Sequence, residues 1–319
     1  MIPYEWLEQA EQRIAGHVRQ TPLTHDAARG LYLKWENRQV TGSFKPRGAL
    51  NKVLSLQPWE RAAGLVAASA GNHGQGVALA GQITAAPVEV FVSEHAVPAK
   101  VQAMRALGAQ VHPVPGGYAE AEAAGRRYAR QQQREFVSPY NDGQVIAGQG
   151  TMALEIVRQL GGADVANWIV PTGGGGLISA IGTLFAHMEH CPTLIGVQAA
   201  ASPFTDSLFH RHTQEGVQDL PTLADGLSGP VEDGSVTIPM IERYVDDFLT
   251  VSEDEVARAM AFAWHVYGET IEGSAAVALA AALRGRVGSG TSVVILTGGN
   301  VDPDVHRKII AEHAGERWA

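Results

Sequence analysis

Four short segments of this 319-residue chain combine residue types that can do chemistry, although they lie far apart in the sequence. They are TGSFKPRG at residues 41–48, SAGNHG at 69–74, PTGGGGL at 171–177 and LTGGN at 296–300. Lys45 in the first segment is a candidate catalytic amine, because a lysine enclosed by protein loses its charge readily. Most lysines are solvated surface residues, so this assignment depends on the other three segments.

The glycine run Gly173 to Gly176 joins an apolar strand-like segment to an apolar helix-like segment. Without Cβ atoms, several backbone amides can converge on one oxyanion at the start of a helix, where the helix dipole also favours negative charge. No Gly-Lys-Ser/Thr follows, the spacing is not G-x-G-x-x-G, and no acidic residue ends a following strand to hold a ribose. The run therefore predicts a monophosphate site, with a flexible hinge as the alternative.

The other two segments also follow predicted strands. Residues 69–74 separate a strand from a helix, which indicates either a second anion site or a tight turn. Thr297 ends the last predicted strand, where α/β sheets usually bind ligands. A lysine, a phosphate loop and a hydroxyl at a strand end are together the groups that hold pyridoxal phosphate through its aldehyde, phosphate and ring nitrogen.

The elements that must position these segments alternate along the chain. Short apolar runs predict strands and are separated by segments of helical period; the predicted strands are 64–69, 88–93, 110–114, 136–140, 167–172, 194–199 and 292–297. This alternation predicts an α/β protein whose parallel sheets are covered on both faces. Ser252 and Glu255 have the capping-box spacing and start a helix that runs to about Tyr267, and a second helix covers 274–285. Residues 203–247 are less regular and are predicted to form a long loop.

Composition excludes several classes of protein. The net charge is −9, from 33 acidic and 24 basic residues without a Lys/Arg cluster, so we expect no nucleic-acid partner. No apolar run reaches the ~18 residues that a membrane span requires, so we expect no membrane association. The single cysteine, Cys191, excludes an intramolecular disulfide, and the N-terminus does not resemble a signal peptide. We therefore expect a soluble cytoplasmic protein.

Seven motifs resemble, in order, those of the serine/threonine dehydratase group of fold-type II pyridoxal-phosphate enzymes, which also contains serine racemase. They are SFKPRGA, SAGNHGQGVALA, VIAGQGTMALEI, PTGGGGLISA, TLADG, IEGSAAVALAA and LTGGNVD, between about Thr21 and Asp302. The resemblance implies an α/β fold like that of the tryptophan synthase β-subunit, with two parallel-sheet lobes and the cofactor in the cleft between them. It implies a larger cofactor-binding domain (1–50 and 143–319), a smaller mobile domain (51–142) and a homodimer.

The resemblance also assigns roles to single residues. Lys45 would hold pyridoxal 5′-phosphate as an internal aldimine, and Phe44 would pack against the ring. Asn72 would donate a hydrogen bond to the ring's 3-oxygen, and Thr297 would face the ring nitrogen. The amides of Gly173, Gly174, Gly175, Gly176 and Leu177 would bind the phosphate, and Ser69, Gly71 and Asn72 would bind the substrate.

The activity that the resemblance implies is loss of water from L-threonine and/or L-serine, followed by release of ammonia and a 2-oxo acid. The alternatives are an ammonia-lyase for 3-hydroxyaspartate or another β-hydroxy amino acid, serine racemase, and a cofactor-binding protein without catalysis. Family racemases carry a second serine where this chain has Ala70, which argues against racemisation.

Two further positions bear on these expectations. The family's divalent-cation site uses an acidic residue where this chain has Gln198, and Asp206 is the nearest acid, so we expect no metal. Glu272 lies near the site by family analogy, and either tunes the cofactor or caps the helix that follows. The chain also stops soon after the LTGGN segment, so we expect no regulatory domain and a catabolic role.

Overall fold

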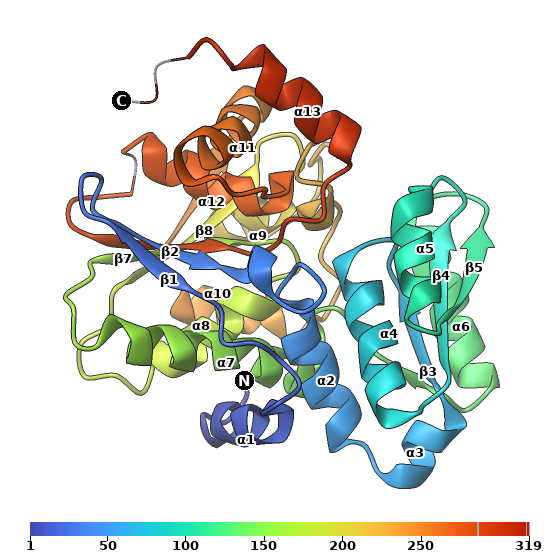
Figure 1. The fold of residues 1–319 in the computed structure, drawn as a ribbon. Helices are drawn as coiled ribbons and strands as arrows, with labels where there is room; N and C mark the ends of the chain where they lie inside the picture. Colours follow the sequence, from blue (N-terminus) through green and yellow to red (C-terminus); the bar gives the residue numbers. More distant parts are fainter. Residues whose placement is uncertain (286, 317, 319) are drawn as a thin grey trace.

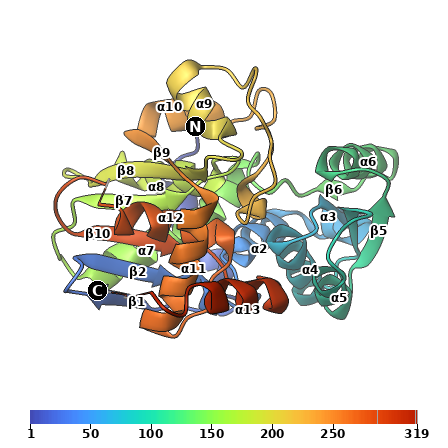
Figure 2. The same ribbon diagram turned by 90° about the horizontal axis from the view of Figure 1, so that it is seen from above.

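The computed structural model describes residues 1–285, 287–316 and 318, and the strands of these residues form two sheets that lie side by side (Figures 1 and 2). The six-stranded sheet has the order β1 (Leu23–Asp26), β2 (Leu31–Trp35), β10 (Ser292–Leu296), β7 (Asn167–Pro171), β8 (Thr193–Ala199) and β9 (Asp247–Val251). The four-stranded sheet has the order β5 (Gln110–Val114), β4 (Val88–Ser93), β3 (Leu65–Ala68) and β6 (Glu135–Phe136). Neighbouring strands are parallel except β1 and β2, which are antiparallel.

The structure confirms the predicted α/β class, and a strand overlaps each predicted strand range. The 136–140 prediction is mostly wrong, because β6 covers only Glu135–Phe136; the Val137 amide still donates to the Val66 carbonyl oxygen at 2.8 Å, and Pro139 has no amide to donate. Three strands were missed: β1, β2 and β9. β2 was missed because Lys34 interrupts its apolar run; Lys34 is nevertheless fully buried, with its amine 2.5 Å from the Glu155 carboxylate.

Helices cover both faces of the six-stranded sheet because successive strand residues point to opposite faces. In β7, Trp168 and Val170 pack on one side, whereas Ile169 packs on the other. The first side is covered by α1 (Glu5–Ile14), α7 (Gly143–Leu160), α8 (Gly176–Phe185) and α10 (Thr237–Tyr244). The second side is covered by α11 (Glu253–Tyr267), α12 (Gly273–Leu283) and α13 (Pro303–Glu312).

The four-stranded sheet is also covered on both faces. On one side lie α2 (Lys45–Ser55), α4 (Asn72–Thr84) and α5 (Pro98–Ala106), and on the other lies α6 (Tyr118–Gln131). The short helix α3 (Pro58–Ala63) connects α2 to β3, and the 3-10 helix η1 (Glu36–Arg38) follows β2. The strands of this sheet all come from residues 65–136. The domain boundaries at 50/51 and 142/143, and the mobility of the smaller domain, stay predictions.

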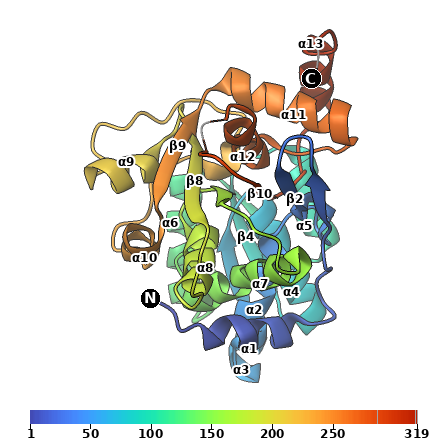
Figure 3. The ribbon, with the colours of Figure 1, turned by 90° about the vertical axis from the view of Figure 1, so that its left-hand side faces the viewer.

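The prediction of a long loop over residues 203–247 is wrong. This stretch contains α9 (Phe204–Arg211), the 3-10 helix η2 (Asp225–Leu227) and α10, and α9 and α10 lie beyond the β9 edge of the sheet (Figures 2 and 3). Each of these two α-helices has eight residues, which is too short for a clear helical period and depends on tertiary packing for its stability. The capping box was predicted correctly, since the Ser252 hydroxyl accepts a hydrogen bond from the Glu255 amide and α11 begins at Glu253.

Helix α2 packs closely against both α4 and α7 (Figure 1). A Cβ atom at Gly148 of α7 would lie 2.4 Å from the Arg47 carbonyl oxygen, and one at Gly76 of α4 would lie 3.1 Å from the Lys45 carbonyl carbon. The buried Arg47 guanidinium also bridges the Glu36 and Glu155 carboxylates, at 2.7 and 3.1 Å. Charges this deep in the protein need such partners, and here they fix the helix that begins at Lys45.

We predict that Gly148→Ala destabilises the protein, because the added methyl group has no room between α7 and α2. Overpacking of this kind costs about 1–3 kcal/mol, which should lower the Tm in a thermal unfolding scan by several degrees. The matched control is Gly315→Ala, where a Cβ meets nothing within 4 Å. Equal Tm values for the two variants would contradict this account of α2.

None of the described helices is both long and apolar enough to cross a lipid bilayer.

Candidate active site

The predicted site residues follow the carboxyl ends of strands in both sheets. Ser69 and Gly71 follow β3, the glycine run follows β7, and Thr297 follows β10. Because β3 lies in one sheet and β7 and β10 in the other, the two sheets contribute different parts of the candidate site.

Backbone pairing brings Lys45 close to Thr297. The Phe44 amide donates to the Thr297 carbonyl oxygen at 3.0 Å, and the Gly299 amide donates to the Gly42 carbonyl oxygen at 2.9 Å. Between them, Ser43 and Gly298 form an antiparallel bridge. These contacts join the LTGGN segment to the start of α2, where Pro46 is tolerated because amides in the first helical turn need no intrahelical acceptor.

The Lys45 amine is set up to lose its proton. Its Nζ lies 3.4 Å from the Pro139 carbonyl oxygen and 5.0 Å from the centroid of the Phe44 ring. Part of the side chain stays accessible, but the protein around it lowers the pKa of the amine to about 8; the Glu272 carboxylate acts in the opposite direction. A lysine with this pKa supplies a far larger neutral fraction near pH 7 than a solvated one, and the neutral form is both nucleophile and base.

The glycine run lies next to the residues that surround Lys45. Tyr140 directly follows Pro139 in the chain, and its ring packs on Gly174: a Cβ atom at Gly174 would lie only 2.3 Å from the Tyr140 Cδ1 atom. The amides of Gly173 to Leu177 donate to no protein acceptor among the described residues, and Leu177 is buried in the first turn of α8. Free amides at a helix start are an anion site, so the geometry fits the predicted monophosphate.

Two side chains from the part of the site that belongs to the six-stranded sheet form hydrogen bonds with Asn72. Its Nδ2 donates to Glu272 Oε1 at 2.7 Å, and its Oδ1 accepts from Asn300 Nδ2 at 2.7 Å. These bonds orient the amide and leave its second N–H free to donate. Glu272 is the N-cap residue of α12 and its carbonyl oxygen accepts from the Ala275 and Ala276 amides, but its side chain makes no capping bond and contacts Asn72 instead.

Glu272 is buried, and its burial raises the pKa of the carboxyl group to about 7. The Asp225 carboxylate also raises this pKa, whereas the hydrogen bond from Asn72 lowers it. Glu272 therefore changes its charge near the pH range in which the Lys45 amine changes its own, and the two groups form an electrostatic pair within the site.

The candidate substrate segment makes mostly local contacts. The Ser69 hydroxyl accepts from the Gly71 amide at 3.1 Å. His73, which the sequence analysis did not single out, contacts the Val137 carbonyl oxygen through Nε2 at 2.8 Å. Burial, together with the Lys45 charge, lowers the pKa of His73 to about 3, so this ring is neutral near pH 7. The sequence did contain a signal for His73 as a residue of the site, because it lies inside the SAGNHG motif.

At the position of the family's cation ligand, Gln198 Oε1 accepts a hydrogen bond from the Asp206 amide at 2.8 Å. Within the described ranges, no group of three or more His, Cys, Asp or Glu side chains could hold a metal ion. That this protein works without a metal stays a prediction.

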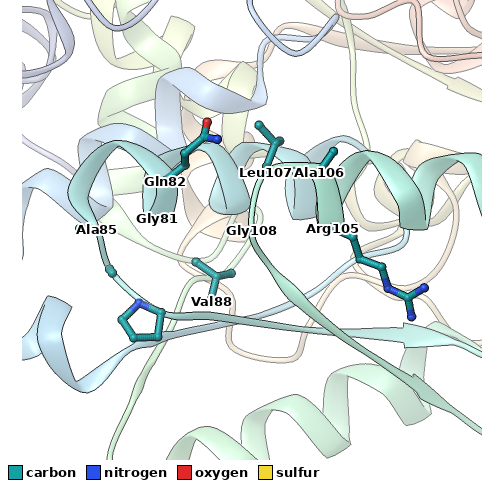
Figure 4. Close-up of a pocket in the computed structure, with 10 residues that line it drawn as sticks. Gly81, Gln82, Ala85, Val88, Arg105, Ala106, Leu107 and Gly108 are labelled. Carbon is teal, nitrogen blue, oxygen red and sulfur yellow. The ribbon is translucent and has the colours of Figure 1, made fainter.

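A separate hollow lies on the surface between the C-terminal ends of α4 and α5 (Figure 4). Gly81, Gln82 and Val88 line one part, and the residues from Arg105 to Gly108 line another. Its lining includes none of the predicted site residues, and Arg105 is the one charged side chain in it. We assign no chemistry to it.

Comparison with known proteins identifies the class of protein that this fold and this site define. A family model described as pyridoxal-phosphate dependent enzyme matches residues 14–298, so the chain belongs to this family. An L-threonine ammonia-lyase from Thermotoga maritima is 39% identical over 97% of this chain and 78% of its own length. A catabolic L-threonine dehydratase from Escherichia coli is 37% identical over 92% of each chain.

Solved structures give the same picture. The processed form of threonine deaminase isoform 2 from Solanum lycopersicum has a TM-score of 0.88 and 28% identity, covering 98% of this chain and 88% of its own. Maize serine racemase has a TM-score of 0.88 and 26% identity, covering 98% of each chain. The predicted fold type II and the predicted cofactor, pyridoxal phosphate, are thereby confirmed.

We predict that covalent attachment of pyridoxal phosphate to the apoprotein follows the deprotonation of the Lys45 amine, whose pKa is about 8. The rate at which the visible absorbance band forms after mixing should rise with pH and reach half its maximum near pH 8. Nα-acetyl-lysine amide serves as the control, with its half-maximum above pH 10. A protein profile that follows the free amine would show that the site does not lower the pKa of Lys45.

A second prediction concerns Glu272. Because the pKa of this carboxyl group is raised from 4.5 to about 7, the protonated form is favoured on folding; this contribution is complete below pH 4.5 and is lost as the pH rises through 7. Glu272→Gln stays neutral at every pH. Between pH 5 and pH 8, the free energy of unfolding of this variant should therefore rise relative to that of the wild type by about 2–3 kcal/mol.

Urea unfolding of the two apoproteins at both pH values measures this difference. Glu312→Gln, the same exchange on the exposed surface of α13, is the matched control for the loss of a carboxylate. If the difference between wild type and Glu272→Gln is the same at both pH values, the account of Glu272 is wrong.

Proposed function

We propose that this protein is an ammonia-lyase that removes water from L-threonine, and also from L-serine, to give 2-oxobutanoate or pyruvate and ammonia. The observation that carries the proposal is the Lys45 amine, with a pKa of about 8, beside Thr297 and a glycine run whose amides have no acceptor in the described part of the chain. The names of relatives that share 37–40% identity with most of this chain support threonine as the substrate.

The cofactor fits the described residues. Gly173 to Gly176 would hold its phosphate, Asn72 its 3-oxygen, Thr297 its ring nitrogen and Lys45 its aldehyde. When bound, pyridoxal phosphate supplies a conjugated ring that withdraws electrons from the substrate's Cα.

The protein's own groups then act on the amino acid. Ser69, the Gly71 amide and Asn72 bind and orient it, and the neutral Lys45 amine takes the proton from Cα. A hydroxyl such as that of Thr297 does not force a proton onto the ring nitrogen, as a carboxylate would. With Thr297 at that position, the bound group would withdraw electrons less strongly, which would favour direct loss of the β-hydroxyl group.

Two neighbouring activities have weaker support. Solved racemases of serine and aspartate share this fold, but racemisation needs an acid or base on each face of Cα, and this chain has Ala70 where family racemases carry their second serine. An ammonia-lyase for 3-hydroxyaspartate would need an arginine near the β-carbon to bind the second carboxylate of this substrate. A homodimer, a cytoplasmic location and closure of residues 51–142 on the substrate remain parts of the proposal.

We predict that purified protein with pyridoxal phosphate releases 2-oxobutanoate from L-threonine, and that Lys45→Ala lowers kcat by about 10²–10⁴-fold or more. The readouts are the absorbance spectrum, 2-oxo acid detection and chiral analysis of the remaining amino acid. Lys308→Ala, on exposed α13, is the matched control and should keep full activity. A spectrum that responds to L-threonine without 2-oxobutanoate, or D-serine as the main product from L-serine, would refute the proposal.

A further inference from the structure

Two threonine hydroxyls donate hydrogen bonds to carbonyl oxygens of the glycine run. Thr205 Oγ1 donates to the Gly173 carbonyl oxygen at 2.5 Å, and Thr237 Oγ1 donates to the Gly174 carbonyl oxygen at 2.7 Å. Both threonines are fully buried. They lie in the first turns of α9 and α10, the helices that the sequence analysis missed.

These contacts determine where the neighbouring amides point. The peptide bonds here are trans, and in a trans peptide the C=O and the following N–H point in opposite directions. Because the Gly173 oxygen faces Thr205, the Gly174 amide faces away from it. Because the Gly174 oxygen faces Thr237, the Gly175 amide faces away in turn. Two successive amides are thus directed away from the threonines, as an anion site requires.

A run of glycines needs such contacts more than an ordinary loop does. The missing Cβ atoms allow an anion to approach, but they also allow each peptide plane to rotate at little cost. Ile241 and Thr237 pack against Gly175, whose φ is +85°, and limit its position. Packing alone does not orient a peptide dipole, whereas a buried hydroxyl that donates to the carbonyl oxygen does.

The Thr237 hydroxyl is itself oriented. Its Oγ1 lies 2.8 Å from the buried Ser235 Oγ. Because the Thr237 proton is used on Gly174, Ser235 is the donor in this pair. The result is a chain of hydrogen bonds from Ser235 through Thr237 to the glycine run.

We propose that Thr205 and Thr237 are positioning residues for the cofactor phosphate: they hold the Gly173 and Gly174 carbonyl groups outward and so direct the amides of Gly174 and Gly175 at the phosphate. This inference rests on the proposed function only for the identity of the cofactor. It requires no particular amino-acid substrate.

The test is the affinity of the apoprotein for pyridoxal phosphate and for pyridoxal, which lacks the phosphate. Thr205→Val and Thr237→Val keep the shape of the side chain and remove the hydroxyl. Each should raise the Kd of pyridoxal phosphate by about 3- to 10-fold, the usual net effect of one hydrogen bond. Each should leave the Kd of pyridoxal unchanged and shift the ³¹P resonance of the bound phosphate. Thr237→Ser keeps the hydroxyl and should bind both ligands as the wild type does.

Thr183→Val is the matched control. Thr183 is equally buried and also donates to a backbone carbonyl, but its acceptor is Ser179 within α8 rather than the glycine run. This variant should not change the ratio of the two Kd values. If Thr237→Val does not fold, Thr205→Val alone decides the outcome.

Unchanged affinities in the valine variants would overturn the inference, and so would equal weakening of pyridoxal phosphate and pyridoxal, which indicates general damage. A wild type that binds pyridoxal phosphate but releases no 2-oxo acid from L-threonine would refute the proposed function and leave this inference standing. The two proposals are thus tested separately.

Discussion

The chemistry of the site depends on a lysine amine, that of Lys45, that is enclosed by protein and contacts no carboxylate among the described residues. Desolvation of Lys45 lowers the pKa of its amine, and this effect lasts only while the surrounding elements stay packed. Those elements are α2, which begins at Lys45, and the two helices on either side of it. Small residues at the helix contacts and the buried Arg47 with its two carboxylates hold α2 in place. Packing far from the reacting atoms therefore sets the chemistry of the amine.

The candidate anion site needs backbone amides that have no acceptor in the protein and yet point in a fixed direction. A phosphate needs several amides without protein acceptors, and free amides in a glycine-rich loop have no fixed direction. The structure solves this from the outer side of the loop, where hydroxyls bind the carbonyl groups. Helices α9 and α10 supply these hydroxyls, and α8 supplies the dipole. In the proposal above, α9 and α10 thus support the phosphate-binding loop, although neither helix lies within the seven motifs that carry the family resemblance.

The two halves of the site meet through side chains that are themselves oriented. Asn72, at the start of α4, is fixed by Glu272 and Asn300 from the other side. Glu272 raises the pKa of Lys45, and the charge of Lys45 lowers the pKa of Glu272. An uncharged Glu272 lets the amine deprotonate more easily, whereas a charged one opposes this. A substitution of Lys45 or Glu272 must therefore alter the pKa of the other group.

The sequence alone determined the α/β class, the approximate positions of most parallel strands and the four segments that surround the candidate site. Apolar runs of strand length and runs of glycine are local signals, and they persist wherever the chain places them. The tertiary structure decided what local signals do not carry. β2 is a buried strand because the charge of Lys34 meets that of Glu155 across the fold. The short helices α9 and α10 form where packing supports them. The hydroxyls of Thr205 and Thr237 face the glycine run, and the Glu272 side chain contacts Asn72. Each of these contacts joins residues that are at least 30 positions apart in the chain. A local sequence pattern carries no information on how far apart two such residues lie in space.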